Sequence, residues 1–280
     1  MKQHPENENP NLAGIKHIIV VSSGKGGVGK STTAVNLALA LKSLGASVGL
    51  YDADIYGPSI PTMLGLPDGT RPEIVDERTM KPVQAHGIAC HSVGFLVDQR
   101  QAMAWRGPMV VGAFNQILND THWGELDYLV VDMPPGTGDI QLSLAQSLAV
   151  SGSVIVTTPQ DIALLDAQRG IEMFRKVGIP ILGVVENMAQ HICSECGHME
   201  HIFGQGGARR IAETYAVDVL GSLPLDKAIR EHSDEGLPIV VADPENPVSL
   251  LYRQIAALVD EAVKDLDSSL SAPKISIMDD

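Results

Sequence analysis

The stretch from Gly24 to Thr32, GKGGVGKST, has the residue types and spacing that bind a nucleotide phosphate. It fits the pattern G-x-x-x-x-G-K-[ST], with an apolar β-branched run before it and a helical pattern after it. Glycines permit a tight loop whose backbone N–H groups point at phosphate oxygens, and the dipole of the following helix adds positive potential. Lys30 would neutralise phosphate charge and the Ser31 hydroxyl would ligate Mg²⁺. The alternative is an ordinary glycine-rich turn at the edge of a sheet. We call residues 24–32 the phosphate loop, and its expected nucleotide contacts are Gly24, Lys25, Gly26, Gly27, Val28, Gly29, Lys30, Ser31 and Thr32.

Acidic residues close two other apolar runs. Asp52 and Asp54 are two residues apart, so their carboxylates point the same way if the backbone stays extended, and they could orient magnesium waters or the attacking water. The alternative for them is a polar turn closed by Gly-Pro. Asp132 follows an apolar stretch that is typical of a buried strand. A carboxylate in this position is the pattern that holds Mg²⁺ through water. Residues 133–139, MPPGTGD, combine stiff prolines with free glycine N–H groups and could sense a γ-phosphate.

A cysteine pair, Cys193 and Cys196, lies in a segment that also holds His191, His198 and His201. A C-x-x-C followed by glycine resembles a knuckle that wraps a metal with two sulfurs. Three chemistries fit. The first is a zinc site completed by a histidine of the same chain, and the second is a redox dithiol, although that motif normally opens a helix and this pair is expected in a long loop. The third is half of a four-thiolate [4Fe–4S] site shared across a two-fold axis. Ligand chemistry alone puts zinc slightly ahead, and an unmetallated structural pair is the remaining alternative.

The remaining cysteine and the N-terminus indicate the compartment. Cys90 lies in an apolar strand-like run and is expected to be a small buried hydrophobe, not a ligand. Three cysteines in 280 residues do not make a disulfide scaffold. The first residues, MKQHPENENPN, contain no apolar signal region. We therefore expect a reduced, cytoplasmic protein.

The charge of the chain restricts its partners. It has 34 acidic and 20 basic residues, for a formal net charge of −14. Nucleic acids and anionic membrane surfaces attract basic proteins, so neither is expected as a partner. No apolar run approaches the roughly 18 residues of a membrane span. A small basic anion site remains compatible with the acidic average.

The segments that position these residues alternate between short apolar runs and longer helical patterns. Because the runs are apolar throughout, which is typical of strands covered on both faces, the sequence predicts an α/β fold with a doubly wound, mainly parallel sheet. Ligands bind such sheets beyond the carboxyl ends of the strands, where the motifs lie. The expected strands are 17–22, 48–52, 88–93, 128–132, 153–157, 181–186 and 217–221. The expected helices are 30–44, 108–119, 140–150, 163–177, 207–215 and 248–266.

Together these motifs resemble the Mrp/ApbC family of iron–sulfur cluster carrier ATPases, which are P-loop NTPases of the deviant Walker A (SIMIBI) type. The resemblance covers about residues 14–265. It implies an ATPase domain at 14–266 that carries the C-x-x-C loop, between a mobile polar arm at 1–13 and a tail at 267–280. The stretches that carry it are GKGGVGKST (24–32), DADIYGPSIP (52–61), RGPM (106–109), DYLVVDMPPGTGD (127–139), VENM (185–188) and CSECG (193–197).

The resemblance implies a homodimer that binds ATP and Mg²⁺, hydrolyses ATP slowly, holds a labile [4Fe–4S] cluster at the subunit interface and delivers it to apoproteins. By motif, Lys25 is the signature lysine that acts on the partner subunit's phosphates, with Lys30 on the chain's own. Asp54 orients the attacking water and Asp132 is the Walker B acid on magnesium, together with Ser31. The cluster ligands are Cys193 and Cys196, and further nucleotide contacts fall on Asn187, Pro224 and Asp226.

Other classes share the phosphate loop. An ATP-switched spatial organiser of the cell-division or plasmid-partition kind binds membrane or DNA, but the C-terminal end of this chain is acid-rich and the cysteine pair would be unexplained. A reductase like the nitrogenase iron protein places its cluster cysteines separately. A zinc-knuckle ATPase without cluster transfer is the strongest chemical alternative. Because Asn187 lies six positions before Cys193, we also hypothesise that nucleotide state moves the cysteine segment.

Overall fold

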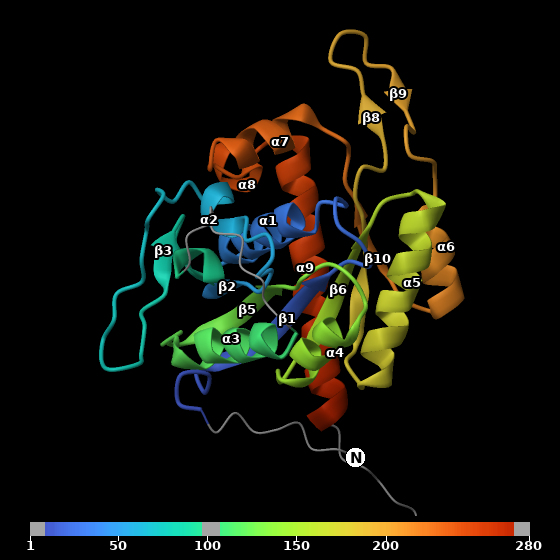
Figure 1. The fold of residues 1–280 in the computed structure, drawn as a ribbon. Coiled ribbons are helices and arrows are strands. Elements are labelled where there is room, and N and C mark those ends of the chain that lie inside the picture. The colour runs from blue at the N-terminus through green and yellow to red at the C-terminus, as the bar shows by residue number, and fades with distance from the viewer. Residues whose placement is uncertain (1–8, 97–106, 272–280) are drawn as a thin grey trace, which may run out of the picture.

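The computed structural model describes residues 9–96 and 107–271. Its main sheet consists of β1 (Ile15–Ser22), β2 (Val48–Asp52), β3 (Val83–Ala85), β4 (Ile88–Ser92), β5 (Leu126–Asp132), β6 (Gly152–Thr157), β7 (Ile181–Glu186) and β10 (Val219–Ser222). The strand order is β10-β7-β6-β1-β5-β2-β4-β3, and every neighbouring pair is parallel except the antiparallel β3–β4 (Figure 1). The predicted fold class, a doubly wound and mainly parallel α/β sheet, is confirmed.

Helices cover both faces of this sheet. They are α1 (Lys30–Ser43), α2 (Ile60–Met63), α3 (Gly107–Asp120), α4 (Asp139–Gln146), α5 (Asp161–Lys176), α6 (Gly207–Tyr215), α7 (Lys227–Asp234), α8 (Ile239–Ala242) and α9 (Pro247–Ser271). Helices α1, α8 and α9 pack on one face, and α3, α4, α5 and α6 on the other. None of the helices in the described ranges is long and apolar enough to cross a membrane.

Each central strand supplies two hydrophobic cores. Ile19 and Val21 of β1 pack in the core beneath α1 and α9, whereas Ile18 and Val20 pack beneath α3, α4 and α5. Successive side chains of a strand point to opposite faces, so a strand covered on both sides must be apolar at every position. This is why the sequence shows continuous apolar runs and no alternation.

Several elements differ from the expectation. The predicted helix 140–150 ends at Gln146, and the chain then leads to β6, just before which the Ser151 N–H donates to the Ile18 carbonyl of β1. The predicted helix 248–266 continues to Ser271, so it covers the first residues of the segment predicted as a tail. After Pro247 at the start of this helix, the next proline is Pro273, so no proline interrupts the helix before that position. The elements that were not predicted are α2, α7, α8, β3, the short strands β8 (His191–Ile192) and β9 (Met199–Glu200), and a 3-10 turn at Val93–Phe95. Residues 1–8 of the predicted arm, Arg106 and residues 272–280 lie outside the described residues.

Burial along α9 yields a stability prediction. Ile255 is 1% exposed and packs in the core with α1, whereas Leu258, one turn further along the same helix, is 42% exposed. We expect Ile255→Ala to lower the free energy of unfolding by about 2–5 kcal/mol through lost burial and a residual cavity. Leu258→Ala is the matched control and should stay within about 0.5 kcal/mol. Urea denaturation of both variants measures this, and equal losses would contradict the assigned packing of α9.

Candidate nucleotide site and cysteine hairpin

The phosphate loop connects β1 to α1, as predicted. Gly27 and Gly29 have φ angles of +79° and +82°, which lie in the left-handed region that glycine adopts without steric strain. Gly29 is also the N-cap of α1, so the unpaired N–H groups of the first helical turn face the loop. The Ser23 hydroxyl donates to the Lys25 carbonyl at 2.9 Å and closes the entry to the loop.

A cavity of about 210 Å³ opens over this loop. It brings together residues that the sequence places far apart, because the carboxyl ends of β1, β2 and β5 meet at one edge of the sheet. Eight of the predicted site residues line it, namely Lys25, Gly26, Gly27, Gly29, Lys30, Ser31, Thr32 and Asp54. The full lining is Ser23, Lys25, Gly26, Gly27, Gly29, Lys30, Ser31, Thr32, Asp54, Ser59, Met63 and Pro135.

Behind the cavity, Lys30 and Asp132 form a buried ion pair. Lys30 Nζ lies 2.5 Å from Asp132 Oδ1 and 3.1 Å from Ser31 Oγ. Burial raises the pKa of Asp132, and the neighbouring Lys30 opposes that rise. The other carboxylate oxygen, Asp132 Oδ2, is buried with no hydrogen-bond partner in the described part of the chain. A buried oxygen of this kind, next to the Ser31 hydroxyl, fits a hydrated Mg²⁺.

Asp54 lines the cavity, whereas Asp52 is not part of its lining, so only one of the two predicted carboxylates borders it. The chain leaves the extended conformation after β2 and turns at residues 55–57. Asp52 is buried and accepts hydrogen bonds from the Ser92 hydroxyl at 3.0 Å and the Ile60 N–H at 3.3 Å. It also accepts one from the Asp54 N–H at 3.2 Å, which leaves the Asp54 side chain at the cavity. Asp52 thus shapes the loop that carries Asp54.

The pKa of Asp52 is raised to about 7, first by burial and then by the charge of Asp132. These two aspartates are register partners on adjacent strands. Sequence reasoning placed Asp52 beside the nucleotide but missed that it faces inward. The available signal was its position as the last residue of a fully buried strand.

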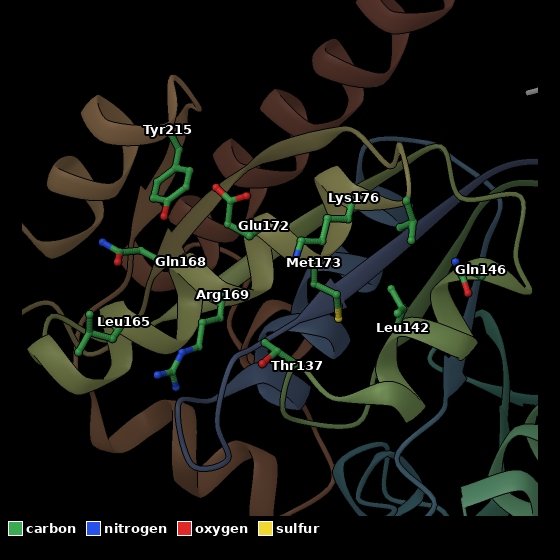
Figure 2. A pocket seen from close by; sticks show the side chains of 11 residues that line it. Thr137, Leu142, Gln146, Leu165, Gln168, Arg169, Glu172, Met173, Lys176 and Tyr215 are labelled. Carbon is green, nitrogen blue, oxygen red and sulfur yellow. The ribbon is translucent and has the colours of Figure 1, made fainter. Parts of the chain in front are cut away.

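A larger cavity of about 610 Å³ lies between α4 and α5, and Figure 2 shows the side chains that line it. Its lining includes none of the predicted site residues. It borders the nucleotide site through one loop, because Thr137 lines this cavity while Pro135 lines the phosphate-loop cavity. The Gly136 N–H donates to the Ser23 carbonyl at 2.9 Å, which fastens this loop beside the phosphate loop.

The cysteine pair lies at the tip of a β-hairpin, so the predicted long loop is wrong. Strands β8 (His191–Ile192) and β9 (Met199–Glu200) pair in antiparallel fashion and project from the body of the molecule (Figure 1). The Cys193 N–H donates to the His198 carbonyl at 2.9 Å, and the Gly197 N–H donates to the Cys193 carbonyl at 2.9 Å. Gly197 has a φ of +71°, which closes the turn.

Within the hairpin, Cys193 is half-buried and Cys196 is exposed. Hydrogen bonds from the backbone N–H groups of Cys196 and Glu195 stabilise the Cys193 thiolate and lower its pKa. Cys90 is buried as expected, and burial raises the pKa of its thiol to about 12. The tip therefore favours the thiolate of Cys193, the form that binds metals, more than an ordinary cysteine environment does.

The three histidines do not complete a metal site with these sulfurs. His191 Nδ1 lies 3.1 Å from the Leu225 carbonyl, and His201 Nδ1 lies 2.8 Å from the Ala189 carbonyl. Among residues 9–96 and 107–271, no group of three or more histidine, cysteine or acidic side chains is placed to hold a metal. The predicted alternative of zinc completed within one chain is therefore not assembled here.

The three residues that the family resemblance assigns to nucleotide binding, Asn187, Pro224 and Asp226, lie beside the base of the hairpin. The Asn187 side chain donates from Nδ2 to the Val28 carbonyl at 2.9 Å. Asp226 caps α7 by accepting from the Ala228 N–H at 2.7 Å, and Pro224 is half-buried before it. The lining of the phosphate-loop cavity includes none of Asn187, Pro224 and Asp226. Their contact with adenine stays a prediction.

The lowered pKa of Cys193 yields a chemical prediction. In reduced, metal-free protein, we expect iodoacetamide to alkylate Cys193 with a half-maximal rate at a pH below 9.0, the ordinary value for a thiol. The sign follows because the folded hairpin stabilises the thiolate, which is the reacting form. Peptide-resolved mass spectrometry between about pH 6 and 10, with a free cysteine peptide as control, measures the midpoint. A midpoint at or above that of the control peptide would contradict the hydrogen bonds assigned to the tip.

Comparison with known proteins gives a consistent result. A family model described as ParA, NUBPL iron-transfer P-loop NTPase, matches residues 14–260. The chain is 61% identical over 247 residues to an iron–sulfur cluster carrier protein of Pseudomonas fragi, covering 88% of this chain and 86% of that protein. It is 54% identical over 260 residues to the iron–sulfur cluster transfer protein NUBPL of Mus musculus, covering 92% of this chain and 80% of that protein.

Solved structures agree with this. A nucleotide-binding protein of Archaeoglobus fulgidus in complex with ADP is 37% identical, with a TM-score of 0.73 over 86% of this chain and 93% of its own. The cell division ATPase MinD of Pyrococcus furiosus, 24% identical with a TM-score of 0.65 over 88% of this chain and 99% of its own, shares the fold. By its phosphate loop, its sheet and its closely similar relatives, the chain belongs to the Mrp/NUBPL family of iron–sulfur cluster carrier proteins, which are ParA-like P-loop NTPases.

Proposed function

We propose that this protein is an ATP-hydrolysing iron–sulfur cluster carrier, which holds a [4Fe–4S] cluster between two copies of the chain and transfers it to apoproteins. The observation that carries the proposal is a C-x-x-C hairpin with a stabilised thiolate in the same chain as a phosphate-loop cavity. Relatives that are named cluster carriers or cluster transfer proteins support the cargo.

At the nucleotide, the backbone N–H groups of the phosphate loop and Lys30 hold the phosphates. Asp132 and Ser31 would hold Mg²⁺, and the phosphates of ATP would give Lys30 a second anionic partner. The ion would supply positive charge that stabilises phosphoryl transfer. Asp54, at the cavity wall, orients the attacking water.

Lys25 acts on the nucleotide of the second copy. Its Nζ lies 3.4 Å from Gln160 Oε1, a neutral partner that does not compete with a phosphate as a carboxylate would. A cation supplied in this way stabilises the transition state of phosphoryl transfer as an arginine finger does. The proposal therefore requires a homodimer in which two phosphate loops face each other.

At the hairpin tip, each chain supplies two sulfurs and the cluster needs four, so a two-fold axis at the two tips completes the site. Ile192 and Met199 flank the cysteines and are 49% and 51% exposed. Apolar side chains at this position favour a contact with a second copy. Cys196 stays exposed, which leaves one side of the cluster open to incoming thiolates of a recipient.

The proposal includes no nucleic-acid or membrane partner, because the net charge of −14 repels both. It places the protein in the cytoplasm, where thiols stay reduced. One relative from Arabidopsis thaliana carries "mitochondrial" in its name, so the compartment is the part of the proposal to be checked by fractionation.

The cargo is tested by anaerobic reconstitution of the purified protein with iron and sulfide. We expect about four irons and four sulfides per dimer, with sulfide-dependent visible absorbance, because two thiolates per chain fill one cluster. A Cys193→Ser/Cys196→Ser variant should lose both and still bind ATP, since the hairpin lies outside the phosphate-loop cavity. Tight zinc binding without sulfide-dependent absorbance would sink the carrier assignment and favour a zinc-knuckle ATPase.

The hydrolytic role is tested at Asp54. We expect Asp54→Asn to lower kcat for ATP roughly a hundredfold, since a positioned carboxylate contributes about that much or more, with ATP affinity changed only a few-fold. Asp265→Asn, an exposed acid on α9 that lies outside the lining of the phosphate-loop cavity, is the matched control and should keep wild-type turnover. Steady-state phosphate release measures both, and an active Asp54→Asn enzyme would refute the assigned role.

A further inference from the structure

We propose that Asn187 is a positioning residue that couples occupancy of the phosphate loop to the conformation of the cysteine hairpin. The inference rests on the proposed function of these two sites and adds the physical connection between them. Asn187 follows β7 directly, and the chain then enters the hairpin.

The first link is the contact of Asn187 with the phosphate loop. Its Nδ2 donates to the Val28 carbonyl at 2.9 Å, and its side chain is buried. A Cβ placed on Gly29 would lie 2.1 Å from that nitrogen, so the amide is packed directly against the loop backbone. Phosphate binding draws the N–H groups of this loop toward the ligand. The loop therefore cannot shift without moving Asn187 or breaking this hydrogen bond.

The second link is a constrained turn immediately after Asn187. The Asn187 N–H donates to the Thr157 carbonyl of β6 at 2.7 Å, which fixes its backbone to the sheet. Its side-chain Oδ1 accepts from the Met188 N–H at 2.9 Å. Met188 has a φ of +55°, in the left-handed region that a non-glycine residue rarely adopts. The same amide group therefore contacts the phosphate loop with one atom and holds the turn with the other.

The third link is Ala189, which connects the two strands at the base of the hairpin. Its N–H donates to the Leu223 carbonyl at 2.9 Å, and its own carbonyl lies 2.8 Å from His201 Nδ1. Ala189 stands before the cysteine pair and His201 stands after it. A displacement at Met188 therefore reaches the segment that carries Cys193 and Cys196 from both sides.

These three links predict which nucleotide is sufficient to change the conformation of the hairpin. It begins at Val28 and Gly29, in the loop that holds the α- and β-phosphates, and not at the 133–138 loop beside the γ-phosphate. ADP with Mg²⁺ should therefore suffice to change the hairpin.

The experiment uses reduced, metal-free full-length protein and measures alkylation rates of Cys193 and Cys196 by peptide mass spectrometry, with and without Mg²⁺–ADP. We expect ADP to change the rates about fivefold in the wild type, at the low end of typical coupling between sites. In Asn187→Ala the ratio should fall to about one while calorimetry still detects ADP binding. Cys90, which is buried, should stay unlabelled and so reports that each variant is folded.

A second variant tests the proposal independently if Asn187→Ala folds poorly. His201→Ala removes the far-leg contact from an exposed position, so it should bind ADP as the wild type does and yet lose most of the ADP effect on labelling. His198→Ala, at the tip of the same hairpin, is the matched control and should keep the effect.

Two results would overturn the proposal: equal labelling rates with and without ADP in the wild type, or an undiminished ADP effect in both Asn187→Ala and His201→Ala. Neither result depends on the cargo, because the protein is metal-free throughout. A protein that reconstitutes a cluster but shows no ADP effect would refute the coupling alone. A protein that shows the effect but binds zinc would refute the carrier function alone.

Discussion

The nucleotide site is organised around a shortage of positive charge at one edge of the sheet. Two buried carboxylates, Asp52 and Asp132, stand in register on adjacent strands, and one buried ammonium, Lys30, lies against them. Burial makes unpaired charge unfavourable, and burial together with the charge of Asp132 raises the pKa of Asp52 to about 7. In the proposed function, a polyphosphate with its magnesium ion would change this balance, because it would bring an anion for Lys30 and a cation for the aspartates.

This edge also explains how distant parts of the chain come to act together. β1 lies between β5 and β6, so the phosphate loop that follows it emerges beside the ends of both neighbours. β5 delivers Asp132 and β6 receives the Asn187 backbone, while β7 leads to the cysteine hairpin. The parallel arrangement, with all of these strands ending on the same side, is what gathers the nucleotide residues and the hairpin base at one end of the sheet.

Much of this could be predicted from sequence because parallel strands with two buried faces leave continuous apolar runs, and because the phosphate loop depends on short-range spacing. The bounds of β2 and β7 were predicted to the residue. The hairpin was not predicted because strands of two residues are too short to show an alternation of apolar and polar residues. The orientation of Asp52 was missed because the turn that follows it is fixed by Ser92 and Ile60, from other parts of the fold. Helix α7 was missed because its sequence is mostly polar and it depends on the Asp226 cap.

The projection of the cysteine hairpin has an evolutionary consequence. Its tip makes no contribution to the two hydrophobic cores, and its base is held by backbone and histidine hydrogen bonds. Substitutions between residues 192 and 200 therefore leave the packing of the sheet untouched. Outside Cys193 and Cys196, selection can change the exposed side chains of the hairpin without changing the packing that positions the nucleotide site. The fold thus separates the residues that support the sheet from a surface that can vary around the cysteine pair.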